Sequence, residues 1–258
     1  MPGPVRSISA IVPVYNEELQ IATIIPALND AFEARGADWE IVVVDNASTD
    51  GTQAELAGFL GSRVRVLRNE VNRGKGFSVR RGMLEATGEL RLLCDADCTP
   101  SLRSLPELEA LGEAFDVVAG ARNDPDSQIA RQQPVYRRAA SLGFIFLCRR
   151  VMAEPLRDVF CGFKLFSGAA ADEVFRRSQV DGWAFDVEAL ALARALGYAV
   201  APCPIAWVHR PGSRLSIPRV VVPALSELIA ARSSVRRHAA LRPVPSDAVA
   251  PVGGGQRP

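Results

Sequence analysis

The chain has 258 residues, of which 48% are hydrophobic and 23% are charged, enough for one large domain with a substantial core. Its net charge of +1 gives no field that would attract nucleic acid, so we expect no nucleic-acid partner. Five irregularly spaced cysteines, no signal-peptide pattern and no apolar run of roughly 18 residues predict reduced thiols, a cytoplasmic location and no transmembrane helix.

The first half of the chain alternates short apolar runs with helical patterns. Strands are predicted at 8–15, 39–46, 63–69, 90–97 and 115–122, and helices at 17–35, 52–60, 75–86 and 101–114. Strands that are apolar throughout and separated by helices are typical of a parallel sheet covered on both faces. The sequence therefore predicts an α/β fold with a mostly parallel central sheet and helices on both faces.

The second half of the chain is less regular. Residues 123–133 are polar and contain Pro125, which predicts a loop. Helices are predicted at 134–152 and 183–196, strands at 159–167 and 198–208, and a further helix from Ser216 to the region of His238. We divide the chain into a main domain at 1–215, a C-terminal helical segment at 216–241 and a Pro- and Gly-rich, disordered tail at 242–258.

Polar and acidic residues follow the ends of three predicted strands. They are Asn16 and Glu17 after the first strand, Asp45 and Asp50 after the second, and Asp95 and Asp97 at the fourth. In open α/β sheets, ligands bind at the carboxyl ends of the strands. Each of these residues alone has an ordinary explanation as a turn former or helix cap. The three strand ends taken together favour a binding site.

The stretch LCDADCTP, at residues 93–100, places Asp95 and Asp97 between Cys94 and Cys98. A zinc site is disfavoured, because no second Cys/His pair follows at the spacing of a zinc finger. Paired carboxylates prefer a hard divalent cation such as Mg²⁺ or Mn²⁺, which keeps coordination positions for phosphate oxygens. An Asp-x-Asp pair arises often by chance, so the surrounding motifs must decide.

Seven motifs occur in order along the chain: VPVYNEE (12–18), VVDNASTDGT (43–52), NRGKGFSVRRGM (72–83), CDADCTP (94–100), DVFCGFKLF (158–166), WAFDVE (183–188) and PIAWVHRPGSRLS (204–216). Together they resemble the inverting glycosyltransferases of family 2. The last three resemble the polyprenyl-phosphate branch, which includes dolichyl-phosphate glucosyltransferases and mannosyltransferases. The resemblance implies a GT-A fold, which is Rossmann-like, and makes residues 1–215 the catalytic domain.

The resemblance also implies a nucleotide-sugar site with a divalent cation. It assigns nucleotide-sugar binding to Pro13, Tyr15, Asn16, Glu17, Asp45, Lys75, Asp95, Asp97 and Arg214, and metal binding to Asp95, Asp97 and Thr99. Asn46 stands where the family often has a second aspartate, so the local charge is lower here. Lys75 also fits a solvated lysine at the start of a helix.

The acceptor side is expected to be rich in arginine. Arg122, Arg137 and Ser141 match positions that bind an acceptor phosphate, which a guanidinium grips with two hydrogen bonds. The predicted catalytic residues are Asp97, Arg122, Arg137 and Asp158, and Asp158 alternatively orders the turn that follows it. Asp186 and Glu188 are further candidates for sugar contacts or for a general base. A phosphate monoester carries about −1.5 to −2 charges at neutral pH, so this nucleophile needs no general base.

The predicted function is transfer of a hexose, with inversion, from a nucleotide diphosphate sugar to a polyprenyl monophosphate, with Mg²⁺ or Mn²⁺ as cofactor. The CGFKLF motif favours UDP-glucose or a related UDP-sugar. The alternatives are GDP-mannose as donor, a soluble sugar or glycan as acceptor, and a nucleotide-binding scaffold without catalysis.

Two helical stretches raise the question of a membrane surface. Residues 134–152 and 220–241 combine apolar side chains with flanking arginines. Such helices lie in a membrane interface or, alternatively, are core helices with solvated ends. We expect a peripheral enzyme at the inner face of the plasma membrane.

Overall fold

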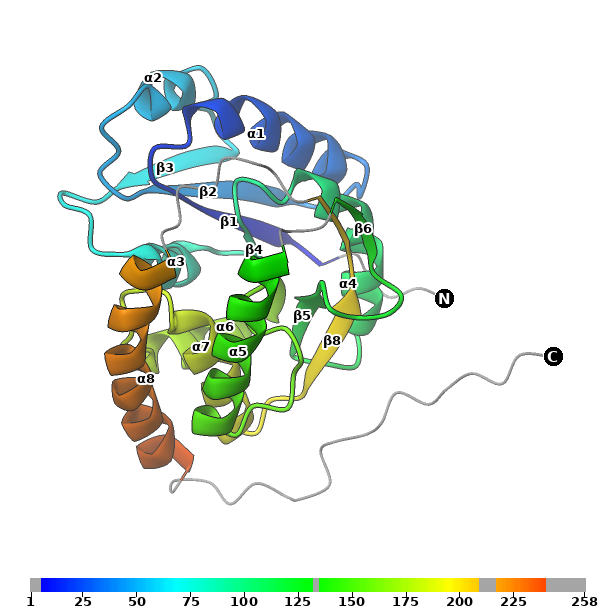
Figure 1. Ribbon diagram of the computed structural model, residues 1–258. Coiled ribbons are helices and arrows are strands. Elements are labelled where there is room, and N and C mark those ends of the chain that lie inside the picture. The colour runs from blue at the N-terminus through cyan, green and yellow to red at the C-terminus, as the bar shows by residue number, and fades with distance from the viewer. Residues whose placement is uncertain (1–5, 132–134, 209–216, 240–258) are drawn as a thin grey trace.

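The computed structural model describes residues 6–131, 135–208 and 217–239 and shows a central sheet between two layers of helices (Figure 1). The strands are β1 (Ile8–Val14), β2 (Trp39–Asp45), β3 (Val64–Arg68), β4 (Leu90–Cys94), β5 (Val117–Ala121), β7 (Phe163–Ser167) and β8 (Val200–Pro204). They form one seven-stranded sheet in the order β3-β2-β1-β4-β7-β5-β8. Neighbouring strands run parallel except for β7, which is antiparallel to both β4 and β5. The mostly parallel sheet predicted from the sequence is confirmed.

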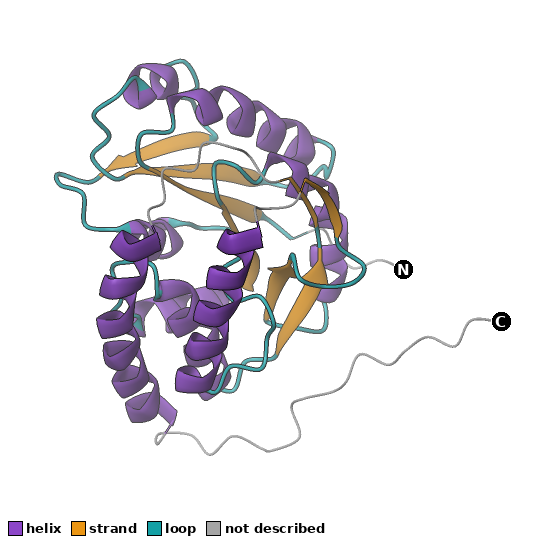
Figure 2. Ribbon diagram, viewed as in Figure 1, coloured by secondary structure: helices purple, strands orange, loops and turns teal. Residues whose placement is uncertain are grey.

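Helices cover both faces of this sheet (Figure 2). The helices α1 (Glu18–Glu33) and α4 (Leu105–Leu111) pack on one face, next to α2 (Thr52–Ala57) and the 3-10 helix η1 (Thr99–Ser104). The other face carries α3 (Lys75–Glu85), α5 (Val135–Met152), α6 (Gly168–Arg177), α7 (Phe185–Ala195) and α8 (Ile217–Ala239). None of the described helices is both long enough and apolar enough to span a bilayer.

The alternation of side chains along the strands explains the two layers. In β2, Ile41 and Val43 join the core beneath α1, while Val42 and Val44 join the core beneath α3 and α7. Successive residues of a strand point to opposite faces, so a strand that is apolar at every position is buried on both sides. This burial is the physical basis for the predicted parallel sheet.

Three elements differ from the sequence prediction. The expected loop at 123–133 contains β6 (Gln128–Arg131), which pairs with β9 (Ala206–Val208) in a separate two-stranded sheet. The expected strand at 198–208 is therefore two strands, β8 and β9. β8 is an edge strand with two prolines, which lack the N–H that a further partner would need. The sequence prediction also missed α6, whose alanine-rich start is capped by the Ser167 hydroxyl accepting from the Ala170 amide.

Candidate active site

The carboxyl ends of β2, β1 and β4 lie next to one another because these three strands are parallel neighbours. Asp45 is the last residue of β2, Asn16 and Glu17 follow β1, and Asp95 follows β4. The polar residues that the sequence places after separate strands therefore meet at one edge of the sheet, which is where α/β folds bind ligands.

Asp45 anchors the loop that follows β2. Its carboxylate is buried and accepts hydrogen bonds from the Ser48 amide at 2.9 Å and from the Gln53 side chain at 3.2 Å. The Ser48 hydroxyl in turn accepts from the amide of Asn16 at 3.0 Å. Asn16 has a φ of 56°, a left-handed conformation that asparagine tolerates better than most residues, and its side chain accepts from the Thr49 amide. These bonds tie the turn after β1 to the turn after β2.

Asp95 is held from two sides at the end of β4. Its amide donates to the carbonyl of Gly162 at 2.9 Å, and its Oδ2 accepts from Lys75 Nζ at 2.6 Å. A Cβ atom at position 162 would lie 1.8 Å from Asp95 Oδ2, so any larger residue there would displace the Asp95 carboxylate. Lys75 is the first residue of α3, and its ammonium lies 5.3 Å from the centre of the Trp183 ring. The GKG, CDAD, CGF and WAF motifs thus converge around one ion pair.

The electrostatics of this cluster shift two groups. Burial opposes the charge of Lys75, but the Asp95 and Asp186 carboxylates outweigh it and raise the pKa of the ammonium group above its ordinary value. Burial, together with the charges of Asp97 and Asp95, raises the pKa of Glu17 to about 7. Glu17 therefore lies among other carboxylates, in a region where a cation is electrostatically favoured.

Oxygen atoms at the Asp95–Thr99 turn are available to a ligand. Asp95 Oδ1 and Thr99 Oγ1 are buried, and within the described residues neither has a hydrogen-bond partner. Asp97 is exposed, and Cys94 and Cys98 are buried free thiols in the core beneath α1. The described part of the chain contains no group of three or more His, Cys, Asp or Glu side chains arranged to hold a metal ion. A cation here would thus depend on a few hard oxygen ligands and on oxygens from a substrate.

Arg122 and Asp158 form an ion pair beyond the end of β5, in which the carboxylate is buried and the guanidinium is partly exposed. The guanidinium donates from Nε and Nη2 to the two carboxylate oxygens at 2.8 and 2.9 Å, and the Arg122 amide donates to the same carboxylate at 2.9 Å. Burial raises the pKa of Asp158, but the Arg122 guanidinium outweighs it and holds this pKa below the usual range. A carboxyl group with a lowered pKa is a weak proton acceptor, so this geometry suits the orientation of Arg122 better than general-base catalysis.

Asp186 and Glu188, the other candidates for a base, are occupied inside the protein. Asp186 forms a fully buried ion pair with Lys164, a residue to which the sequence analysis gave no role. Glu188 accepts from the Ser178 hydroxyl and from the amides of Gln179 and Val180. Both carboxylates stabilise the segment that carries Trp183 to the cluster.

Pro13 lies in β1, and Tyr15 follows this strand with an exposed side chain. Arg137 and Ser141 belong to α5, but their side chains lie outside the part of the chain that the structure describes. Arg214 and residues 240–258 also lie outside it.

Comparison with known proteins identifies the family. Residues 9–175 match the family model described as glycosyl transferase family 2. The dolichyl-phosphate beta-glucosyltransferase of Mus musculus is 31% identical over 229 residues, which cover 83% of this chain and 71% of that protein. Its counterpart in Dictyostelium discoideum is 30% identical over 223 residues, which cover 81% of this chain and 68% of that protein.

Solved structures give the same fold. The glucosyl-3-phosphoglycerate synthase of Mycobacterium tuberculosis, in complex with Mn²⁺, uridine diphosphate and phosphoglyceric acid, superposes with a TM-score of 0.65. The match covers 94% of this chain and 80% of that one at 19% identity, which supports likeness of fold alone. Together with the family match, these findings show that the chain is a glycosyltransferase of family 2 with the GT-A fold.

Proposed function

We propose that this enzyme transfers glucose from UDP-glucose to a polyprenyl monophosphate with inversion at the anomeric carbon. The observation that carries the proposal is the match to dolichyl-phosphate beta-glucosyltransferases over more than four fifths of the chain. This match favours a glucosyl donor over GDP-mannose and a lipid phosphate over a soluble acceptor.

The donor occupies the carboxyl ends of β1, β2 and β4 in this proposal. Asp45 and the turn that contains Asn16 hold the nucleoside, and Lys75 and Asp95 face the diphosphate. The support for this assignment is the 2.6 Å ion pair between Lys75 and Asp95, which puts a fixed positive charge beside Asp95 Oδ1, an oxygen with no hydrogen-bond partner among the described residues. A preorganised charge of this kind stabilises negative charge that develops on a leaving group.

A divalent cation, Mg²⁺ or Mn²⁺, fits the oxygen ligands of this turn. Asp95 Oδ1, the Asp97 carboxylate and Thr99 Oγ1 would hold it, with donor phosphate oxygens completing its coordination. When bound, the cation supplies positive charge that neutralises the departing diphosphate. Mn²⁺ together with uridine diphosphate in the solved glucosyl-3-phosphoglycerate synthase gives independent support.

The acceptor approaches from the side of Arg122. Arg122, oriented by Asp158, binds the acceptor phosphate together with Arg137 and Ser141 of α5. A phosphate oxygen attacks the anomeric carbon, the bond from that carbon to the UDP oxygen breaks, and its electron pair leaves with the diphosphate. The attacking oxygen is already deprotonated at neutral pH, so the residues align the reactants and no proton acceptor is required.

A lipid acceptor implies that the enzyme works at a membrane surface, and we place it at the cytoplasmic face as a peripheral protein. The helices α5 and α8 pack against each other. Together they expose four large apolar side chains, which are Phe146, Leu147, Leu225 and Ile229. Exposed arginines lie on the same helices, and such a combination attracts anionic lipid.

Turnover with defined substrates tests the proposal. Labelled UDP-glucose and a polyprenyl phosphate are expected to give a glucosylated lipid with Mg²⁺ or Mn²⁺ and none after chelation. Asp95→Asn is expected to lower kcat/KM by about 100-fold or more, because it weakens both the cation site and the Lys75 contact. Equal or better turnover with GDP-mannose, or with a soluble phosphate in place of the lipid, would contradict the assignment. Binding of UDP without turnover would point to a scaffold.

A further inference from the structure

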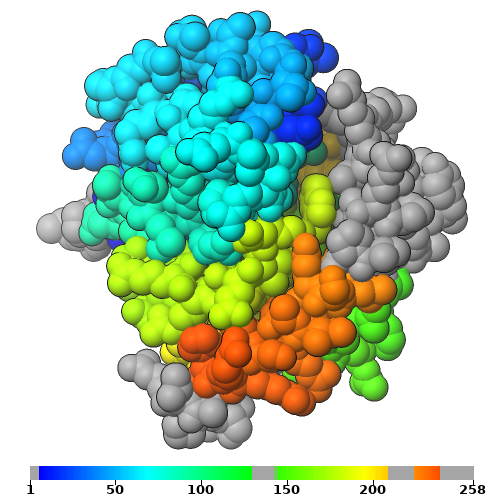
Figure 3. All heavy atoms as spheres, turned by 90° about the vertical axis from the view of Figure 1, so that its left-hand side faces the viewer, coloured from blue at the N-terminus to red at the C-terminus, as the bar shows by residue number. Residues whose placement is uncertain are grey.

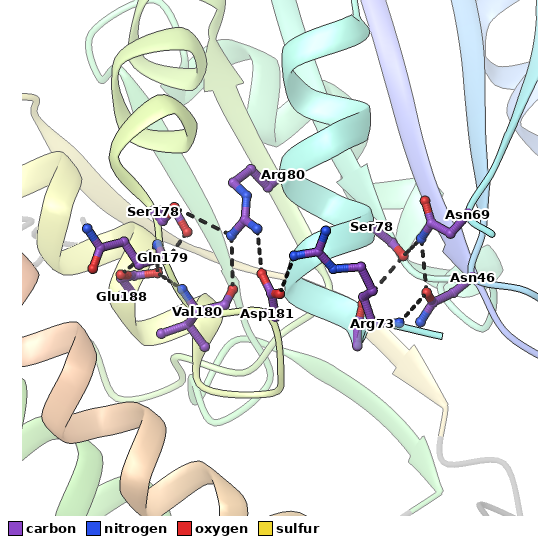
Figure 4. Close-up of polar contacts among 11 residues, drawn as sticks. Asn46, Asn69, Arg73, Ser78, Arg80, Ser178, Gln179, Val180, Asp181 and Glu188 are labelled. Atoms are coloured by element: carbon purple, nitrogen blue, oxygen red, sulfur yellow. Dashed lines mark hydrogen bonds and ion pairs between the residues drawn. The ribbon is translucent and has the colours of Figure 1, made fainter. Parts of the chain in front are cut away.

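A chain of three side-chain amides joins the end of β2 to the turn before α3 (Figure 4 shows Asn46, Asn69, Arg73 and Ser78 of this network). Asn46 is buried, and its Oδ1 accepts from Asn69 Nδ2 at 2.9 Å and from the Arg73 amide at 3.1 Å. Its Nδ2 donates to Asn72 Oδ1 at 2.8 Å, which also accepts from the Gly74 amide at 3.1 Å. Asn46 at the end of β2 thus contacts Asn69, which follows β3, and residues 72 and 73 of the turn before α3.

The orientation of every amide in this chain is determined by a neighbour that can only donate. The Arg73 amide requires the oxygen of Asn46 on its side, so the nitrogen of Asn46 faces Asn72. The Gly74 amide requires the oxygen of Asn72. The Arg81 guanidinium, which donates to Asn69 Oδ1 at 2.8 Å, requires that the nitrogen of Asn69 face Asn46. The network therefore needs a donor at one end of the Asn46 side chain and an acceptor at the other.

The turn at 72–74, which this network holds in place, positions Lys75 at the candidate active site. Gly74 has a φ of 105°, in the left-handed region, and a Cβ atom there would lie 2.3 Å from the Asp181 carbonyl. The next residue is Lys75, which contacts Asp95. Asp181 also forms ion pairs with Arg73 and Arg80. The turn at 72–74 therefore lies between the amide network and the segment at 178–184 (Figure 4). Figure 3 shows these two parts of the chain in contact at the surface.

We propose that Asn46 is a positioning residue of the donor site, whose neutral side-chain amide fixes the turn at 72–74 and thereby the placement of Lys75 against Asp95. The inference rests on the proposed role of Lys75 beside the donor diphosphate. Asn46 itself touches no substrate in this scheme and acts through Lys75.

A carboxylate at position 46 interrupts this network of hydrogen bonds between side-chain amides. One oxygen still accepts from Asn69 and from the Arg73 amide, but the other faces Asn72 Oδ1, and two acceptors then oppose each other. Rotation of the Asn72 amide removes that conflict and leaves the Gly74 amide without an acceptor. A protonated carboxyl group, in contrast, donates from its O–H where the asparagine donated from its NH₂. Substitution by aspartate therefore disturbs the turn only while the aspartate is ionised.

The pH dependence of Asn46→Asp is the test. The KM for UDP-glucose is expected to rise about tenfold at a pH of about 8, the effect of one lost buried hydrogen bond, with a smaller change in kcat. The ratio of variant to wild-type KM is expected to fall toward one at a pH of about 5.5, because burial raises the pKa of the new carboxyl group. The charged groups on the segments packed around position 46 are Asp45, Arg68, Arg73 and Arg81. Titration of these groups is common to both proteins and cancels in the ratio. Their charges also act on the new carboxyl group, which only the variant has: the arginines lower its pKa and Asp45 raises it, and this sets the pH at which the ratio falls.

Matched variants separate geometry from charge. Asn72→Asp adds the same charge but keeps an acceptor for both Asn46 and the Gly74 amide, so its KM is expected to stay within about twofold of wild type at both pH values. Asn72→Ala removes that acceptor and is expected to raise KM at both. Asn29→Asp, on the exposed face of α1, controls for net charge. A KM ratio for Asn46→Asp that does not change with pH, or equal effects of the two Asn72 variants, overturns the proposal.

Thermal unfolding keeps this test independent of the substrate. The midpoint of Asn46→Asp relative to wild type is expected to rise as the pH falls from about 8 to 5.5, since the protonated form completes the network. If wild type fails to use UDP-glucose while this shift appears, the proposed substrate is wrong, but the role of Asn46 in fixing the turn at 72–74 is supported. If UDP-glucose is used and neither KM nor midpoint depends on pH in this way, the role of Asn46 is wrong.

Discussion

Asp158 shows how one pair of residues makes stability depend on pH. Its carboxylate is almost fully buried and receives the guanidinium and the amide of Arg122. The Arg122 charge outweighs burial and lowers the pKa of Asp158, so the ionised form stabilises the folded state. For a lowered pKa, this stabilisation is complete above the unfolded value of about 3.9 and is lost as the pH falls through the folded value.

Asp158→Asn is therefore expected to lower the free energy of unfolding by about 3 kcal/mol at neutral pH, because it leaves Arg122 without its counter-ion. The difference from wild type should shrink as the pH falls below about 4 and Asp158 becomes protonated. Denaturant titrations of both proteins across this range measure it. A difference that stays constant down to a pH of about 2.5 would contradict the ionic origin of the stabilisation.

At the scale of single residues, the sequence indicated the types of side chain at the site but not all of their contacts. The strand ends predicted that Asp45 and Asp95 would lie at one edge of the sheet, and the parallel order of β2, β1 and β4 confirms it. The role of Asn46 was not predicted, because the direction of an amide depends on donors from a distant turn. Lys164 was also missed, since a lysine within an apolar run gives no sign of its buried partner Asp186.

At the scale of elements, one segment connects α8 to the candidate active site. Glu227 of α8 accepts from the Ala184 amide at 3.0 Å, and its carboxylate fills the space where a Cβ atom at Gly182 would lie. The same segment carries Trp183, whose ring lies over Lys75. The C-terminal helix therefore supports the wall of the site through one carboxylate.

Glu227→Ala is expected to lower the free energy of unfolding by about 1.5 to 3 kcal/mol, the range for a hydrogen bond to a charged group. The Ala184 amide should lose protection from hydrogen exchange, and the KM for UDP-glucose should rise because Trp183 is less well held. Hydrogen exchange measured by mass spectrometry, together with steady-state kinetics, provides the readouts. Glu55→Ala, at an exposed position of α2, serves as the control. If protection at 178–185 is unchanged, Glu227 does not support this segment.

The elements also show what a local pattern can predict. Strands that are buried on both faces were found correctly because burial leaves a continuous apolar run. Within the part of the chain that the structure describes, β6 and β9 pair only with each other, at the margin of the fold, and β6 is polar, so neither gives such a run. α6 was missed because its ten residues follow β7 without an intervening turn, although its buried residues Ala170, Ala171, Val174 and Phe175 recur at helical spacing.

At the scale of the whole molecule, α5 and α8 lie side by side and expose large apolar side chains (Figure 1). Phe146 of α5 is 63% exposed and Ile229 of α8 is 70% exposed. Arg150, Arg232 and Arg236 are exposed on the same two helices. Insertion of the apolar side chains into a bilayer, with arginines at anionic headgroups, would bring the enzyme to a lipid acceptor.

The double variant Phe146→Ser/Ile229→Ser is expected to bind vesicles that contain anionic lipid at least about tenfold more weakly, because two exposed side chains no longer enter the apolar phase. Its turnover of a short, water-soluble polyprenyl phosphate should match wild type, since neither residue lies at the site. Leu19→Ser, which changes an exposed leucine on α1, leaves vesicle binding intact if the surface on α5 and α8 is specific. Flotation at low and high salt measures binding. Equal flotation of the double variant and wild type would place the membrane contact elsewhere on the molecule.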